Sequence, residues 1–590
     1  MKQFFKFVFA SFFGTILALF IGFFFFFSIV IAISSSFGGG DEEKVEIEKN
    51  SLLTLKLNSS ISERKKDNEF EDFALNFSLG EGSSLSLPEI LYSIQAAKED
   101  EKISGIFLDL TMFGGGSTAR SSIKDALLDF KASGKKIYAY ADYYTESTYF
   151  LAATADSIFL QPTGSMDFDG SSMEMMFFKG AFEKLDIEPR VIKHGKFKSA
   201  GEPFTEKKMS DYNRKQSKAL LQSIYTQYLF ELGETRGIDS AQLRAIATEL
   251  KIRSAADAVK HGLIDELVYR DQMEDKLAAF MGERVYKDVE KISISKYAGT
   301  LSSAYASDKI AVVYAVGSIG MGEGDDENIG AARISKAIKD ARENESVRAI
   351  VLRVNSPGGS ALASDVILRE MALCKEAGMP TVVSMGDVAA SGGYYISCQA
   401  DHIMAQPTTL TGSIGVIGFI PGTQKFFENK LGITYDRIKT GPYADLGNPN
   451  REMTAEEEGI IQHSIDRIYK EFISHVALGR GLDTAYVNKH GQGRVWTGIQ
   501  AKELGLVDEL GNLEDAINKA AELALVGDFQ IKEYPKLKNP VEEMIKAFGG
   551  SVTQKVIKEE IGQANFDVYK QLKWITSFDE PMMVMPVFIK

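Results

Sequence analysis

Residues 386–408 read GDVAASGGYYISCQADHIMAQPT, and residues 141–163 read ADYYTESTYFLAATADSIFLQPT, so one pattern occurs twice in this chain. The two copies are 245 residues apart (386 − 141), and the offset holds through the whole stretch. Further along, HGLIDEL from His261 matches LGLVDEL from Leu504. Units of this size far exceed the roughly 20–50 residues of solenoid repeats. The sequence therefore predicts a duplicated domain.

Each copy has the pattern of an α/β fold. In the second copy, the β-branched runs KIAVVYAVGSI, AIVLRV and TVVSMG end near Gly, Ser or Asn. Helical stretches such as ALASDVILREMALCKEAG lie between them. This alternation predicts a mostly parallel sheet in each copy. Ligands of such folds bind at the carboxyl ends of the strands, and the glycine-rich turns fall at those ends.

The N-terminus lies outside the duplication and is strongly apolar. No residue from Phe7 to Ile33 is charged, Lys2 and Lys6 precede this run, and an acidic stretch begins at Asp41. As a helix the run would span about 40 Å, more than the ~30 Å hydrocarbon core of a bilayer. A cleaved signal peptide is the alternative, but its apolar core has only about 7–15 residues. We expect one uncleaved transmembrane helix, with the rest of the chain outside the cytoplasm.

The composition argues against several classes of function. The net charge is −14 and no stripe of Lys and Arg interleaves with aromatic residues, which argues against a nucleic-acid partner. The chain has two cysteines, Cys374 and Cys398, which we expect to be buried thiols because two cysteines make no disulfide framework. The six histidines are scattered and no CxxC or HExxH motif occurs, so we expect neither a metal nor a cofactor.

Ser391 is the candidate nucleophile. A serine hydroxyl needs a base within hydrogen-bond reach, and the tetrahedral intermediate needs two donors for its oxyanion. In AASGGYY, small neighbours permit a sharp turn that exposes the hydroxyl, and the N–H of Gly392 is one candidate donor. The second donor would come from NSPGGS, where Gly358 and Gly359 offer bare backbone amides. One such turn alone is usually a simple strand-to-helix connection, but two at neighbouring strand ends indicate acyl transfer.

The two copies have lost opposite halves of this site. Where the second copy has its serine and the two following glycines, the first copy has Glu146, Ser147 and Thr148. In a second matched stretch, VIKHGKFKSAGEP against RIKTGPYADLGNP, the first copy has Lys198 and the second has Ala444. This pattern indicates a Ser/Lys dyad divided between two repeats.

The choice of base remains open from the residues alone. Lys198 is one of several lysines, with Lys193 and Lys196 beside it. A lysine base must be neutral, which requires burial or a nearby cation to lower its pKa toward roughly 7–8. His402 follows the serine by eleven residues (402 − 391) and begins an expected strand, so it is better explained as a surface or core residue. His194 could support a neighbouring lysine.

Four segments carry a family resemblance: FKSAGEPF, VNSPGGS, GDVAASGGYYIS and TGSIGVIG. They resemble the signal peptide peptidase A family, in its long, membrane-anchored bacterial form, and the resemblance covers nearly the whole chain after the apolar run. It implies tandem domains of the Clp protease and crotonase type. It also implies that Ser391 is the nucleophile, Lys198 the general base and Ser413 the residue that orients the lysine, with Gly358 and Gly392 as oxyanion donors.

The resemblance also implies a function. We expect a membrane-anchored serine endopeptidase that degrades cleaved signal peptides and other hydrophobic peptides, without a cofactor. It would lie in the bacterial cytoplasmic membrane, with its catalytic part on the extracytoplasmic side, and would form a homo-oligomer, a tetramer by family resemblance. Two alternatives belong to other classes: a crotonase-type acyl-thioester enzyme, and a non-catalytic membrane scaffold.

The expected organisation has four parts. Residues 1–40 form the cytoplasmic N-terminus and anchor, and residues 41–305 the repeat with the lysine. Residues 306–535 form the repeat with the serine. Residues 536–590 form a tail that ends in PMMVMPVFIK, to which the sequence assigns no role.

Overall fold

The structure is a computed structural model, and it describes residues 47–64, 85–301, 306–537 and 582–585, with a few helical positions between residues 14 and 25. Most of the expected membrane anchor lies outside the described residues. Among the residues that are described, every helix is too short or too polar to cross a bilayer.

The first copy is built on a six-stranded parallel sheet with strand order β6-β4-β3-β2-β1-β7. Its strands are β1 (Ser51–Leu55), β2 (Ile103–Asp109), β3 (Lys136–Tyr144), β4 (Ser157–Met166), β6 (Glu266–Leu267) and β7 (Lys291–Ser293). The strands are rich in Ile, Leu, Phe and Tyr and are mostly buried, as expected for a parallel sheet covered by helices.

The second copy repeats this order with β18-β14-β13-β11-β8-β19. Its strands are β8 (Lys309–Val316), β11 (Val347–Ser356), β13 (Thr381–Ala390), β14 (His402–Ala405), β18 (Glu509–Leu510) and β19 (Gln530–Tyr534). Past its middle, β13 also pairs with β15 (Leu410–Gly412), which pairs antiparallel with β17 (Val495–Thr497). The predicted α/β class, the parallel sheets and the duplication are confirmed.

Matched hydrogen bonds recur in the two copies. The Tyr149 hydroxyl donates to the Leu263 carbonyl at 2.7 Å, and the Tyr394 hydroxyl donates to the Leu506 carbonyl at 2.8 Å. The sequence offset of these pairs is 245 residues for the tyrosines (394 − 149) and 243 for the leucines (506 − 263). The repeat in sequence is therefore a repeat in three dimensions.

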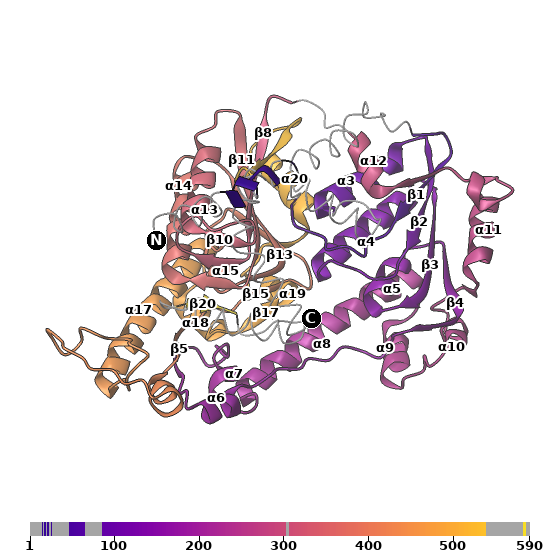
Figure 1. Cartoon of the computed structure of the whole chain (residues 1–590). Helices are drawn as coiled ribbons and strands as arrows, with labels where there is room; N and C mark the ends of the chain where they lie inside the picture. Colours follow the sequence, from indigo (N-terminus) through magenta and orange to yellow (C-terminus); the bar gives the residue numbers. More distant parts are fainter. Residues whose placement is uncertain are drawn as a thin grey trace.

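Helices cover both sheets, and the two copies lie side by side (Figure 1). Each of the two largest hydrophobic cores packs against one of these sheets, and smaller cores lie on the other faces. The main helices of the first copy are α3 (Leu87–Glu99), α4 (Ser117–Lys131) and α8 (Asp211–Arg236). Their counterparts in the second are α13 (Ala331–Arg342), α14 (Ala361–Glu376) and α17 (Ala455–Arg480). Both cysteines are buried free thiols in the second copy, as predicted.

A third sheet joins the copies and has the order β10-β9-β12-β20-β16-β5. Its strands are β9 (Ser318–Gly320), β10 (Asn328–Gly330), β12 (Gly358–Ser360), β16 (Val416–Ile420), β20 (Met582–Val584) and, from the first copy, β5 (Arg190–His194). The antiparallel register places Val416 opposite His194 and Ile420 opposite Arg190. An arm of the first copy therefore reaches into the second.

Candidate active site

Three residues far apart in sequence meet in one buried site. The Lys198 Nζ atom lies 2.7 Å from the Ser391 Oγ atom. It also lies 3.1 Å from both the hydroxyl and the carbonyl oxygen of Ser413. All three side chains are fully buried. The structure thus brings together the lysine, the nucleophile candidate and the orienting serine that the sequence singled out.

The serine occupies a strained turn. Ser391 follows the last residue of β13 and precedes the short helix α15 (Gly392–Tyr395), with a φ of 57°. A non-glycine residue in this region is uncommon and costs about 1–3 kcal/mol, so the surroundings must hold it. One of those restraints is its own N–H, which donates to the Gly412 carbonyl at 2.8 Å. The hydroxyl is thereby turned toward the lysine.

The second copy encloses the lysine of the first. After β5 the chain turns at Gly195, which has a φ of 118°, and the Phe197 N–H donates to the Gln492 carbonyl at 2.9 Å. A Cβ atom at Gly493 would come within 2.6 Å of the Lys198 Cβ atom. Only glycine at this position lets the two segments approach so closely.

The environment of Lys198 favours the neutral amine. Complete burial lowers its pKa well below the ordinary lysine value, because the charged ammonium form loses its solvation. A neutral amine 2.7 Å from a serine hydroxyl can take the proton of that hydroxyl. The buried polar groups within reach are hydroxyl and carbonyl oxygens, which can orient the amine.

The two glycine-rich turns lie next to each other. A Cβ atom at Gly358, whose φ is 101°, would come within 2.7 Å of the Gly392 nitrogen and 2.0 Å of the Met583 carbonyl oxygen. The Gly392 nitrogen and the Met583 carbonyl oxygen therefore both lie close to the backbone of Gly358. The N–H of Gly358 itself donates to the Ser356 hydroxyl at 3.1 Å, and Gly359 is the residue that pairs with Met583.

The histidine alternatives lie away from the serine. His402, at the start of β14, pairs with Glu509 at 3.2 Å. The His194 ring pairs with Asp466 at 2.7 Å and stacks on Tyr469. Both rings have structural partners of their own, so Lys198 is the basic group that contacts the serine hydroxyl.

The strand β20 was not foreseen from the sequence. It lies antiparallel between β12 and β16, with Met583 opposite Gly359 and Met582 opposite Ile417. The Met585 N–H donates to the Pro357 carbonyl at 2.8 Å. An extended segment from the end of the chain thus fills the gap beside the two glycine turns. The only signal in the sequence was the apolar character of PMMVMPVFIK.

In the first copy the equivalent site has become structural. The Glu146 carboxylate accepts hydrogen bonds from the backbone N–H groups of Gly170 at 2.9 Å and Asp169 at 3.2 Å, and burial raises its pKa. The Arg120 guanidinium donates to the Ser147 hydroxyl at 2.8 Å. A glutamate with these partners offers no nucleophile, which agrees with the predicted loss of function in this copy.

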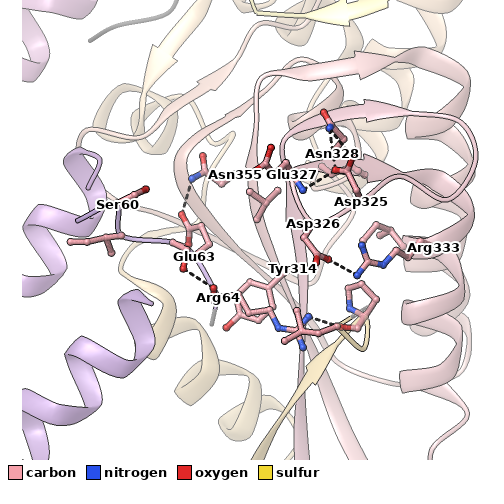
Figure 2. Close-up of a pocket in the computed structure, with 17 residues that line it drawn as sticks. Ser60, Glu63, Arg64, Tyr314, Asp325, Asp326, Glu327, Asn328, Arg333 and Asn355 are labelled. Atoms are coloured by element: carbon pink, nitrogen blue, oxygen red, sulfur yellow. Dashed lines mark hydrogen bonds and ion pairs between the residues drawn. The ribbon is translucent and has the colours of Figure 1, made fainter. Parts of the chain in front are cut away.

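A cavity of about 340 Å³ is lined in part by Tyr314 of β8 and Asn355 of β11 (Figure 2). It is lined by charged residues of both copies, among them Glu63, Arg64, Asp326 and Arg333, but not by Ser391. Glu63 forms an ion pair with the fully buried Arg353, with a Nε–Oε2 distance of 2.9 Å. Sequence reasoning missed this pair because each partner alone looks like a surface charge.

Comparisons with known proteins agree with the duplication. The model of peptidase family S49 matches residues 129–282 and again 374–527, at the offset of 245 (374 − 129). Protease 4 of Haemophilus influenzae is 37% identical over 456 residues, which cover 74% of this chain and 73% of that protein. The chloroplastic serine protease SPPA of Arabidopsis thaliana is 32% identical over 520 residues, 86% of this chain and 74% of that protein.

A solved structure, a ClpP1 mutant from Listeria monocytogenes, matches 35% of this chain and 94% of its own with 16% identity and a TM-score of 0.21. A TM-score this low carries no argument about the fold. The S49 model matches both repeats, and the two long relatives, one of them named a serine protease, cover 74% and 86% of this chain. This chain belongs to peptidase family S49 and is a serine protease.

Proposed function

We propose that this serine protease is an endopeptidase that works with a Ser/Lys dyad: Ser391 is the nucleophile and Lys198 the general base. The observation that carries the proposal is the 2.7 Å separation of Lys198 Nζ and Ser391 Oγ in a fully buried site. The lowered pKa of Lys198 supports it, because a base must be unprotonated before it acts.

The proposed reaction follows the geometry. Lys198 Nζ takes the Ser391 proton while Oγ attacks the carbonyl carbon of a peptide bond, and the carbonyl oxygen becomes an oxyanion. The Gly392 N–H and an amide of the Gly358–Gly359 turn stabilise that charge. Lys198 then gives its proton to the leaving amine as the C–N bond breaks. Water hydrolyses the ester to a carboxylate and restores the hydroxyl. Ser413 keeps the amine directed at the serine throughout.

The substrate would bind as an extended strand between β12 and β16, where β20 now lies. Strand addition provides main-chain hydrogen bonds, and alternate side chains enter pockets. Met585 lies in an apolar cluster that includes Ala390, the residue before the nucleophile, and Leu220 of the first copy. Such a groove suits apolar peptides better than charged ones.

We further propose that these peptides include cleaved signal peptides, which are apolar and extended near a membrane. The apolar run from Phe7 to Ile33 supports an anchor, which would hold the protease in the bacterial cytoplasmic membrane with its catalytic part on the extracytoplasmic side. A tethered enzyme would meet substrates that barely enter water.

We also propose a homo-oligomer, and the internal repeat supports it. The arm of the first copy carries Lys198 into the second copy, but the corresponding arm of the second copy projects from the molecule (lower left in Figure 1). That arm bears exposed apolar residues, including the fully exposed Ile438, and Ala444 stands where the lysine would be. On α14, Leu362 and Val366 are also exposed. A second copy of the chain would cover these surfaces in the same head-to-tail manner.

A fluorophosphonate probe tests the dyad. We expect it to label Ser391 in the wild type, and we expect Ser391→Ala and Lys198→Ala to lose both labelling and cleavage of an apolar peptide. The matched control is Lys196→Ala, because Lys196 is an exposed lysine two positions away. A crotonase-type enzyme or an inactive scaffold would not be labelled at Ser391. Labelling at full rate in Lys198→Ala would refute the lysine base.

A further inference from the structure

The last part of β13 departs from regular pairing just before the nucleophile. Along β11 and β13, Val354 pairs with Met385, but the next pair is Ser356 with Ala389. One residue of β11 therefore faces three residues of β13, Gly386 to Val388. Bulges of this kind redirect a strand and must be held in place by their surroundings. Here the redirected strand ends at Ser391.

Asp387, which lies in this bulge, forms hydrogen bonds with the first copy. The Asp387 Oδ1 atom accepts hydrogen bonds from the Thr118 N–H at 2.9 Å, the Thr118 hydroxyl at 3.1 Å and the Ser117 hydroxyl at 3.2 Å. The three donor groups belong to the first two residues of α4, a 15-residue helix whose N-terminus favours a negative charge. A Cβ atom at Gly116 would come within 1.8 Å of Asp387 Oδ2. The helix start fits the carboxylate closely.

A second set of hydrogen bonds links the bulge to Glu63 of the first copy. The Glu63 carboxylate accepts from the Asn355 amide at 2.7 Å, as Figure 2 shows, and pairs with Arg353. The Asn355 side-chain oxygen in turn accepts the N–H of Val388 at 3.2 Å. The first copy thus reaches the bulge in two ways, directly at Asp387 and through Asn355, and neither residue touches the serine.

The start of α4, where Asp387 binds, has a counterpart in the second copy. It begins at the end of GGGS, residues 114–117, which corresponds to the glycine turn of NSPGGS. Arg120, one turn further along α4, is partly buried; burial lowers its pKa, and interactions with Tyr228, Glu231, Asp387 and Glu146 oppose that shift. In the copy that has no nucleophile, the glycine turn now binds a carboxylate of the other copy.

We infer that Asp387 is a positioning residue: by docking on the start of α4 it fixes the β13 bulge, and so sets the place of Ser391 against Lys198. The inference rests on the proposed dyad. Lys198 belongs to the first copy and Ser391 to the second. Any movement of one copy relative to the other therefore changes the distance between the reacting atoms. A misplacement of about 1 Å can cost roughly 100-fold in rate.

The chain supplies a matched control. Asp142 holds the position of Asp387 in the first copy, at the offset of 245 (387 − 142), on the corresponding strand β3. It is exposed and accepts a hydrogen bond from the hydroxyl of Tyr140 on its own strand at 3.0 Å. Asp142→Ala therefore makes the same chemical change without touching the contact between the copies.

The test uses the full-length protein and reports kcat per active site, with sites counted by fluorophosphonate titration of Ser391. We expect Asp387→Ala to lower kcat roughly 10- to 100-fold with little change in KM. Asp387→Asn should stay within about fivefold of the wild type, because its amide oxygen still accepts the Thr118 N–H. Asp142→Ala should match the wild type.

A second variant reaches the same contact from the other copy. Gly116→Ala should push the Asp387 carboxylate away and reproduce the kcat loss of Asp387→Ala, although Gly116 lies in the first copy. If Asp387→Ala only lowers the number of titratable sites and leaves kcat per site unchanged, the residue merely stabilises the fold and the inference is wrong. A wild-type enzyme that is not labelled at Ser391 would instead refute the proposed dyad, and the two failures are distinct.

Discussion

The two glycine-rich turns of this chain began as the same structure and now have different occupants. In the second copy the turn at Gly358 lies beside the Gly392 amide and pairs with the strand β20. In the first copy the turn that ends at Gly116 receives the side chain of Asp387. Both turns still offer backbone N–H groups at the start of a helix. In our proposals, the turn of the second copy serves the chemistry, and the turn of the first copy binds Asp387 and so positions Ser391.

The same contrast applies at the position of the nucleophile. The Ser391 hydroxyl lies 2.7 Å from the Lys198 amine, whose pKa is lowered by burial, whereas the Glu146 carboxylate accepts hydrogen bonds from the N–H groups of Asp169 and Gly170. Whether a buried side chain can react depends on its hydrogen-bond partners. The two copies share a fold, but the partners at this position differ. The predictions below test how complete this division of labour is.

The largest effect should follow from removing the basic nitrogen of the first copy. Lys198→Arg should lose several orders of magnitude in kcat/KM, like Ser391→Ala, because a guanidinium keeps its proton at any usable pH. Ala444→Lys should not rescue Lys198→Ala, since the arm that carries residue 444 does not reach Ser391. Initial rates on an apolar peptide measure both. Rescue would mean that the second copy can complete a dyad alone.

A smaller loss is expected at the residue that orients the lysine. Ser413→Ala removes the hydroxyl 3.1 Å from Lys198 Nζ but leaves the Ser413 carbonyl as a second partner. We expect roughly 10- to 100-fold lower kcat, typical for the loss of an orienting hydrogen bond next to a reacting group. Thr411→Val is the control, because its hydroxyl donates to the Ala389 carbonyl instead. Equal losses in both variants would show a general packing effect.

Removing the end of the chain should have a modest effect of opposite sign. Without residues 582–590, β20 can no longer compete with a peptide for the space between β12 and β16. KM should fall about 2- to 10-fold, as expected when a tethered competitor is lost. Met585→Asp, which puts a charge into the apolar cluster around Ala390, should act in the same direction. An unchanged KM in both variants would place the substrate elsewhere.

The smallest effect is expected in the first copy. Glu146→Ser places a serine at the nucleophile position but does not restore the following glycines, and the second copy has Ala444 at the position that matches Lys198. We expect no second fluorophosphonate label in a Ser391→Ala background, which intact-protein mass spectrometry can check. A label on residue 146 would show that the first copy has kept a working site.

The features that can be predicted from the sequence are those that the internal repeat reveals. The α/β class, the duplication and the pairing of Ser391 with a lysine site follow from comparing two halves of one chain. The choice of Lys198 over Lys193 and Lys196 needed the family resemblance, because the deciding property is burial: Lys198 is fully buried and Lys196 is exposed. Burial depends on the second copy closing over the lysine. The boundaries of the expected domains and the anchor stay predictions.

Contacts between the copies could not be predicted. Asp387, Glu63 and Arg353 are charged residues of ordinary appearance, and their partners lie about 270 to 290 residues away. The strand β20 pairs with β12, and the two segments lie more than 200 residues apart in the sequence (582 − 360). Local sequence patterns predict helices and strands, but they do not predict which copy a side chain will contact.

The pH dependence of Ser391 acylation tests the central claim most directly, because it reads the protonation state of the base contributed by the other copy. Lys198 must lose its proton to act, and burial lowers its pKa well below the ~10.4 of a free lysine. The single-turnover rate of fluorophosphonate labelling should therefore rise with pH and level off well below pH 10.4. A rate that peaks in acid and falls above neutrality would contradict a lysine base and the division of the dyad between the two copies.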